Sequence, residues 1–91
     1  MAQRFWIAEI RISPAMETKI RTRRFLTGDQ VREACVPDCY ERAGWDDDPV
    51  HGRRLAVRCT TPDGVRLMVL LQPVDVDEGI WRLRNVLRRM G

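Results

Sequence analysis

The chain has 91 residues, of which 44% are hydrophobic and 32% charged, a composition typical of a folded globular domain and not of a disordered chain. No apolar run approaches the roughly 18 residues that a membrane span needs. Glu9 interrupts the N-terminal segment where a signal peptide would be apolar. We therefore expect a single domain over residues 1–91, with no membrane span and no export signal, in the cytoplasm.

The charge is unevenly spread along the chain. There are 16 basic and 13 acidic residues, a net charge of +3, which is modest for a protein that binds an anionic partner. Residues 1–24 and 53–91 are each net positive, however, and residues 25–52 between them are net negative. If the two basic segments meet in space, they form a positive face that the total charge hides.

The first half of the chain predicts one strand and two short helices. Apolar residues alternate over residues 4–12, which is typical of a half-buried strand. Ser13 and Pro14 form a helix start, with serine as the cap and proline at the first helical position. Thr27 and Gln30 have the spacing of a capping box that starts a second helix. Because almost no residues separate the two helices, we expect a compact helical hairpin.

The second half predicts an antiparallel sheet. Residues 39–45 are interpreted as a short edge strand and the acidic residues 46–52 as a loop. Strands over residues 53–60, 65–72 and 80–86 follow, separated by turns that contain proline and glycine. The predicted fold class is therefore α+β, with an N-terminal strand, a helical hairpin and then an antiparallel meander of three to four strands.

Strand alternation places five arginines on the face of this meander that is turned away from the helices. They are Arg54, Arg58, Arg66, Arg82 and Arg84. Met68 and Leu70 lie among them, and carboxylates are nearly absent from the predicted face. One interpretation is that this is an ordinary solvent-exposed sheet face, on which arginine is common. Arginines around a few apolar groups also suit phosphate contacts with base contacts between them. Both interpretations stay open.

The cysteines and the single histidine raise the alternative of a zinc site. Cys35, Cys39, His51 and Cys59 could supply four ligands, but the chain has neither the C-x2-C nor the H-x3-H spacing of common zinc sites. The simpler interpretation is that Cys35 and Cys59 are small buried hydrophobes. No metal site is assigned, and no cofactor is expected.

Most of the chain resembles the BrnT-like proteins, which are related to the RelE and ParE toxins of bacterial toxin–antitoxin pairs. The resemblance rests on K-I-R-T-R-R-F-L-T-G-D-Q-V-R-E-A, residues 19–34, and on the phrases G-R-R-L-A-V, T-P-D-G-V-R-L-M-V-L-L and W-R-L-R-N-V. It implies a RelE-like fold and an endoribonuclease that cuts mRNA without a metal, by attack of a 2′-hydroxyl on the adjacent phosphate. The chain departs from the family in its short tail after the last strand and in its single lysine, Lys19.

Such chemistry needs cations on the phosphate and side chains that transfer protons. The resemblance implies that Arg58, Arg82 and Arg84 contact the phosphate and that His51 acts as acid or base, with Tyr40 as an alternative. Further contacts to RNA are expected from Arg54, Arg66, Lys19 and Arg88.

RNA is accordingly one expected partner, and a cognate antitoxin or another acidic protein is a second. The thin stability margin of so short a chain also leaves a homodimer open. The alternative function is that of a non-catalytic binding protein, either a nucleic-acid-binding module or a protein–protein adaptor. Its arginine-rich sheet face would then dock an anionic partner.

Overall fold

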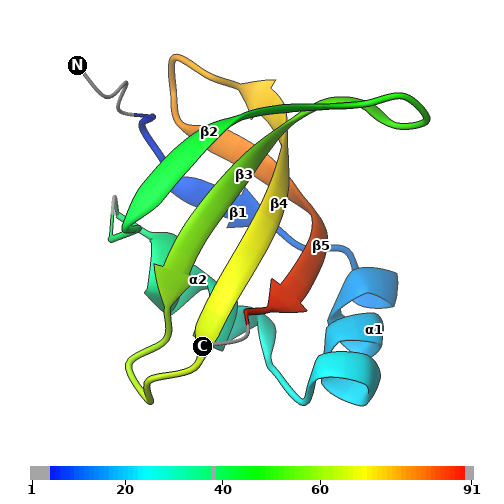
Figure 1. The fold of residues 1–91 in the computed structure, drawn as a ribbon, viewed down its shortest axis with the longest axis vertical. Coiled ribbons are helices and arrows are strands. Elements are labelled where there is room, and N and C mark those ends of the chain that lie inside the picture. The colour runs from blue at the N-terminus through cyan, green and yellow to red at the C-terminus, as the bar shows by residue number, and fades with distance from the viewer. Residues whose placement is uncertain (1–4, 38, 90–91) are drawn as a thin grey trace.

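The computed structural model describes residues 5–37 and 39–89, so the predicted strand residue Arg4 lies outside it. The fold is a five-stranded sheet with two helices, of which one lies behind the sheet and the other beside the end of its last strand (Figure 1). The helices are α1 (Pro14–Arg24) and α2 (Gly28–Cys35), and the strands are β1 (Glu9–Arg11), β2 (Arg42–Asp48), β3 (Gly52–Thr60), β4 (Arg66–Asp75) and β5 (Ile80–Arg88). The predicted α+β class is confirmed.

The strand order in the sheet is β1-β5-β4-β3-β2. Strands β2 to β5 form an antiparallel meander, and β1 pairs parallel to β5 at the edge. The last strand, β5, therefore lies between β1 and β4, so the arginine-rich strand is inside the sheet and not at its edge. No helix in the described part of the chain is long and apolar enough to cross a membrane.

Both predicted helix starts are confirmed by their caps. The Ser13 hydroxyl accepts a hydrogen bond from the Met16 N–H at 3.1 Å. The Thr27 hydroxyl accepts from the Gln30 N–H at 3.2 Å, and the Gln30 side chain accepts from the Thr27 N–H at 2.8 Å. These bonds satisfy N–H groups that a helix leaves without a partner in its first turn.

The core lies between the helices and one face of the sheet. Its members are largely the residues that strand alternation assigned to the packed face, including Leu55, Val57, Leu67, Val69 and Trp81. Cys35 and Cys59 are buried there with their Sγ atoms 3.4 Å apart. The hydrogen bond to Cys59 and burial raise the pKa of Cys35. The interpretation of these two cysteines as buried hydrophobes is confirmed. Among the described residues, no cluster of three or more His, Cys, Asp or Glu could hold a metal ion.

Strand β1 is shorter than the predicted strand over residues 4–12, because the ladder is interrupted near its start. The N–H groups of Ala8 and Glu9 both donate to the carbonyl oxygen of Gly79, at 2.9 and 3.0 Å. Two successive N–H groups therefore share one acceptor, and the alternation of side chains is shifted at this point. Phe5 and Ile7 are buried without belonging to a strand.

The prediction of a loop over residues 46–52 is wrong, because the three aspartates belong to β2. Asp46 pairs with Arg54 and Asp47 with Arg53 in the β2–β3 register. Arginines on the neighbouring strand compensate the carboxylates, and such cross-strand pairs of opposite charge stabilise a sheet. The connecting loop is reduced to residues 49–51.

Strand β5 contains a bulge that the alternation did not predict. Leu71 pairs with Leu83 and Leu70 with Asn85, so Arg84 is an extra residue between them. The bulge reverses which side chains face the core in the last part of the strand. Val86 is consequently buried, and the strand continues to Arg88 and does not end at Val86.

Tyr40 supports the fold through hydrogen bonds to the backbone of Phe5. It is buried, its hydroxyl accepts from the Phe5 N–H at 2.7 Å, and it donates to the Phe5 carbonyl oxygen at 2.7 Å. Replacing Tyr40 by phenylalanine leaves both backbone groups without this partner, so we expect the free energy of unfolding to fall by about 2 kcal/mol. Urea denaturation measures the change. A lost RNA-dependent activity with unchanged stability would instead restore Tyr40 as an acid or base.

Candidate functional site

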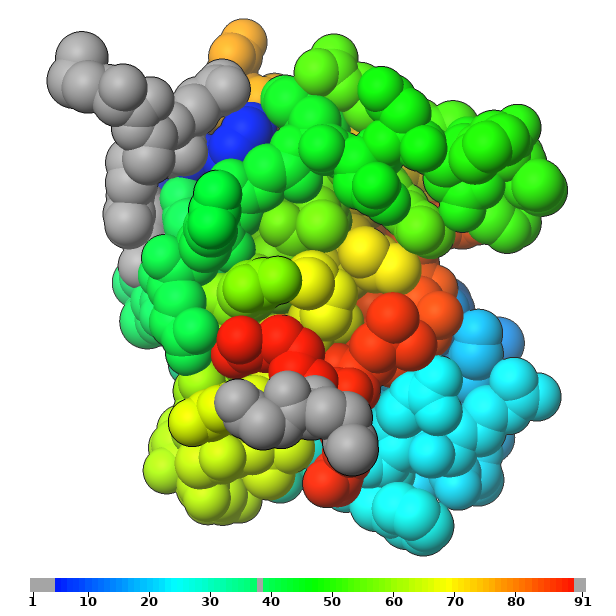
Figure 2. Space-filling view, in the orientation of Figure 1, coloured from blue at the N-terminus to red at the C-terminus, as the bar shows by residue number. Residues whose placement is uncertain are grey.

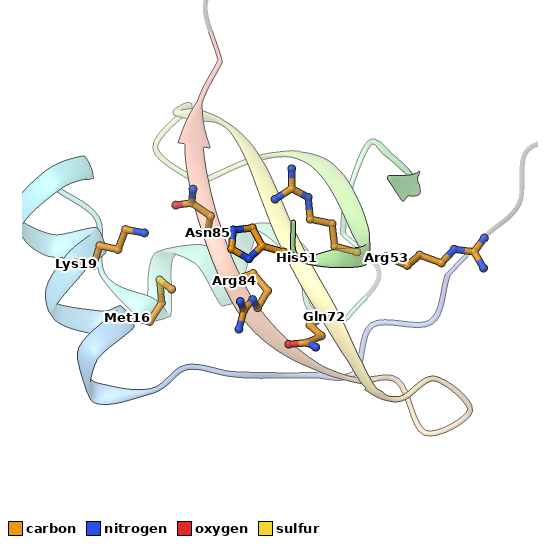
Figure 3. Close-up of a pocket in the computed structure, with 8 residues that line it drawn as sticks. Met16, Lys19, His51, Arg53, Gln72, Arg84 and Asn85 are labelled. Atoms are coloured by element: carbon orange, nitrogen blue, oxygen red, sulfur yellow. The ribbon is translucent and has the colours of Figure 1, made fainter. Parts of the chain in front are cut away.

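A hollow of about 300 Å³ opens between α1, the β2–β3 hairpin and the strands β4 and β5. Figure 2 shows the sheet recessed between the green hairpin and the cyan end of α1. The residues that line it are Met16, Lys19, His51, Arg53, Arg54, Gln72, Arg84 and Asn85 (Figure 3). The hollow therefore collects side chains from segments that are far apart in the sequence.

Three different local structures bring the polar side chains to the hollow. Lys19 extends from the middle of α1 toward β5 (Figure 3). Arg84 and Asn85 reach the hollow at the bulge of β5, and a bulge commonly redirects a side chain in this way. His51 comes from the short loop between β2 and β3, at the tip of a hairpin that projects past β4 and β5 (Figure 1).

The loop that carries His51 is held by Asp48. One carboxylate oxygen of Asp48 accepts hydrogen bonds from the N–H groups of Val50, at 2.7 Å, and His51, at 3.1 Å. The other oxygen lies 3.2 Å from the Arg54 guanidinium. The two backbone hydrogen bonds, together with the nearby Arg54, lower the pKa of the Asp48 carboxyl. Asp48 is therefore a positioning residue for His51.

Replacing Asp48 by alanine is expected to release the loop, with faster hydrogen exchange at the Val50 and His51 amides. Because the folded-state pKa of Asp48 is lowered, its stabilisation is present above the ordinary aspartate pKa of about 4. It is lost as the pH falls through the lower folded-state value. NMR hydrogen exchange at several pH values measures both effects. The matched control is Asp47→Ala, whose exposed carboxylate binds neither amide. Equal exchange in both variants would contradict this role.

The lining of the hollow contains four cations and, among the described residues, no carboxylate. Arg54 is compensated by Asp46, at 3.1 Å, and by Asp48. The Arg53 guanidinium lies 4.5 Å from the centre of the Trp45 ring, and its side chain points away from the hollow (Figure 3). Lys19 and Arg84 form no ion pair within residues 5–37 and 39–89 and are the cations left for an anionic ligand.

The open face of the sheet is less uniformly basic than the sequence predicted. On this face, Asp46 of β2 lies opposite Arg54 of β3. Gly44, which has no side chain, lies opposite Ala56. Leu70, which was expected to be accessible among the arginines, is only 5% exposed. The long arginine stems on neighbouring strands can cover an apolar group in this way. The open face is therefore a mixture of arginines, aspartate and small or covered apolar residues.

The structure brings four of the eight predicted site residues to one hollow: Lys19, His51, Arg54 and Arg84. Arg82 lines an adjoining hollow with Arg11, and the two hollows share Met16 and Arg84. The remaining three predicted residues lie elsewhere. Arg58 lines a separate hollow beside β2.

Arg66 and Arg88 also lie away from the hollow. Arg66 is six residues before Gln72 on β4, about 20 Å along the strand. The Arg88 guanidinium donates to the Arg24 carbonyl oxygen at 2.8 and 3.1 Å and so contacts the end of α1. Gln72 and Asn85 line the hollow without having been predicted, and no motif in the sequence marks either of them.

Comparison with known proteins returns no match for this chain, neither to a family model, nor to a curated protein, nor to a solved structure. Any assignment of function therefore rests on the hollow and the side chains that line it.

Proposed function

We propose that the protein binds RNA at this hollow and cleaves it by attack of a 2′-hydroxyl on the adjacent phosphate. The observation that carries the proposal is the convergence of Lys19, His51 and Arg84 on one hollow, from a helix, a loop and a strand bulge. Two uncompensated cations suit the negative charge of a phosphodiester, and arginine can contact two phosphate oxygens at once. The histidine adds a side chain that transfers protons.

In the proposed reaction the 2′-oxygen forms a bond to phosphorus, and the bond from phosphorus to the 5′-oxygen breaks. His51 takes the proton of the 2′-hydroxyl as general base, the role that histidine fills most often in catalysis. Water, which reaches the open hollow, supplies a proton to the departing 5′-oxygen. Arg84 and Lys19 stabilise the additional negative charge that develops on the phosphate. The products are a 2′,3′-cyclic phosphate end and a 5′-hydroxyl end.

The order of the elements supports a RelE-like toxin as the biological context. The folded chain has a strand, two helices and then a meander whose last strand is rich in arginine, and the quoted phrases that resemble the BrnT-like proteins lie in the helices and in this meander. A toxin of this kind needs an inhibitor, so we include in the proposal a small antitoxin with an acidic or amphipathic segment that covers the hollow.

A non-catalytic nucleic-acid-binding module is the second candidate. The observation that favours it is that His51 is exposed and is the one proton-transferring side chain in the described lining of the hollow. Such a protein would bind RNA with an affinity that falls steeply as the salt concentration rises, and it would leave the RNA intact.

The test is incubation of the purified chain with a single-stranded RNA in the presence of EDTA, followed by analysis of the product ends. We expect 2′,3′-cyclic phosphate and 5′-hydroxyl ends from the native protein and not from a His51→Gln preparation purified in parallel. Induced expression in a bacterial host should arrest growth with the native protein alone. Bound but intact RNA would overturn the cleavage proposal in favour of the binding module.

A further inference from the structure

Phe25, directly after α1, combines exposure with an unfavourable backbone conformation. The residue is 79% exposed, and its φ and ψ angles of 56° and 42° lie in the left-handed region. Glycine or asparagine usually occupies this position at the end of a helix, because other side chains are strained there. The turn itself is needed, since it brings the buried Leu26 into the core. The aromatic ring, however, contributes almost nothing to the core, and strain of this kind is concentrated at functional positions.

The surroundings of Phe25 are basic and rigidly held. Phe25, Leu87 and three arginines, Arg23, Arg24 and Arg88, line a shallow hollow at the end of α1. The Arg24 side chain donates to the Val86 carbonyl oxygen at 2.8 Å, and the Arg88 guanidinium donates to the Arg24 carbonyl oxygen. These hydrogen bonds tie the residue before Phe25 to the end of β5. The ring therefore projects from a fixed support.

The shallow hollow around Phe25 forms an aromatic patch. This patch adjoins the hollow of Lys19, His51 and Arg84 along two elements, α1 and β5. Lys19 lines the hollow and Arg23 lines the patch, and residues four apart on a helix share a face. On β5, Asn85 lines the hollow and Leu87 lines the patch, and residues two apart on a strand share a face. The two sites are thus about 6–7 Å apart along each element. Figure 1 shows α1 beside the end of β5, so neighbouring nucleotides of one strand can occupy both sites.

We propose that Phe25 is a stacking platform for an unpaired base of the RNA strand whose phosphate occupies the Lys19–Arg84 hollow, so that the substrate is single-stranded. This inference rests on the proposed function and specifies its substrate. An exposed aromatic ring among cations is the arrangement with which proteins bind single-stranded nucleic acids, because every unpaired base presents a flat face. A protein partner fits the patch less well, because its apolar part consists of Phe25 and Leu87 alone, surrounded by arginines.

The experiment measures binding by fluorescence anisotropy to a short labelled RNA with 2′-O-methyl groups, which cannot be cleaved. Phe25→Asn removes the ring and suits the left-handed conformation, so folding is preserved. We expect it to weaken binding of the single strand by about 5- to 150-fold. Phe25→Trp should restore binding, and Phe25→Leu, which is apolar but has no ring, should not. Binding of the same sequence as a duplex should be equally weak for all variants, because its bases are already stacked.

Unchanged single-strand binding by Phe25→Asn, or full binding by Phe25→Leu, would overturn the stacking role and leave the patch to a protein partner. A parallel measurement uses single-stranded DNA of the same sequence, which has no 2′-substituent, and an equal loss of binding by Phe25→Asn in DNA supports recognition of the base. If the native protein fails to cleave RNA while Phe25→Asn still weakens single-strand binding selectively, the stacking inference stands and the cleavage proposal fails. If the native protein binds no RNA, both fail.

Discussion

His51→Gln is expected to lower the rate of RNA cleavage by about 10²- to 10⁴-fold, the usual contribution of a general acid or base. Glutamine keeps a polar side chain of similar reach but cannot take the proton of the 2′-hydroxyl. The backbone of the loop stays in place, because Asp48 holds the N–H of residue 51 and not its side chain. Single-turnover cleavage of a labelled RNA measures the chemical step.

The matched control is Val50→Gln, which introduces the same side chain at the neighbouring position of the loop. Val50 is 81% exposed and does not line the hollow, so its replacement should leave the rate within about twofold of the native value, the range of ordinary surface substitutions. Binding of 2′-O-methyl RNA should be similar in both variants. A rate that falls equally in the two proteins would mean that the loop, and not the imidazole, supports cleavage.

Gly79→Ala is expected to lower the free energy of unfolding by about 3 kcal/mol, because strain and a steric clash combine. Gly79 has a φ angle of +71°, and a Cβ atom added there would lie 2.7 Å from Trp6 Nε1 and 2.9 Å from the Ala8 nitrogen. The same glycine supplies the carbonyl oxygen that accepts from Ala8 and Glu9. A displacement at Gly79 would therefore loosen β1 from β5, together with the hydrogen bond from the Trp81 indole to the Trp6 carbonyl oxygen.

Gly64→Ala separates the two contributions. Gly64 also has a positive φ angle, +90°, but an added Cβ atom there would meet nothing within 4 Å. Its replacement should therefore show the conformational strain alone, about 1 kcal/mol. Thermal and urea denaturation of the two variants compare the values. Equal destabilisation would show that the contact between residues 6–8 and the turn at Gly79 is looser than the structure indicates.

The candidate site was only partly predictable, and the reason differs from residue to residue. Lys19 and His51 were identified by residue type and Arg54 and Arg84 by strand alternation, and all four line one hollow. Arg58 and Arg66 were grouped with Arg84 because strand alternation assigns them one face. Alternation assigns the face but not the register between neighbouring strands, and the register decides which of these arginines lie side by side. Arg88 was assigned to a tail, but β5 extends through it, and the bulge at Arg84 turns it toward α1.

The sequence by itself determined the features that depend on near neighbours in the chain. The caps at Ser13 and Thr27, the α+β order of the elements and the packed face of the meander all follow from local hydrogen bonds and alternation. Only the tertiary structure decided that the aspartates of residues 46–48 extend β2, that Arg84 forms a bulge and that His51 and Lys19 line one hollow. These features depend on strand register and on which segments become neighbours. Both are set by contacts between residues far apart in the sequence, which local patterns do not encode.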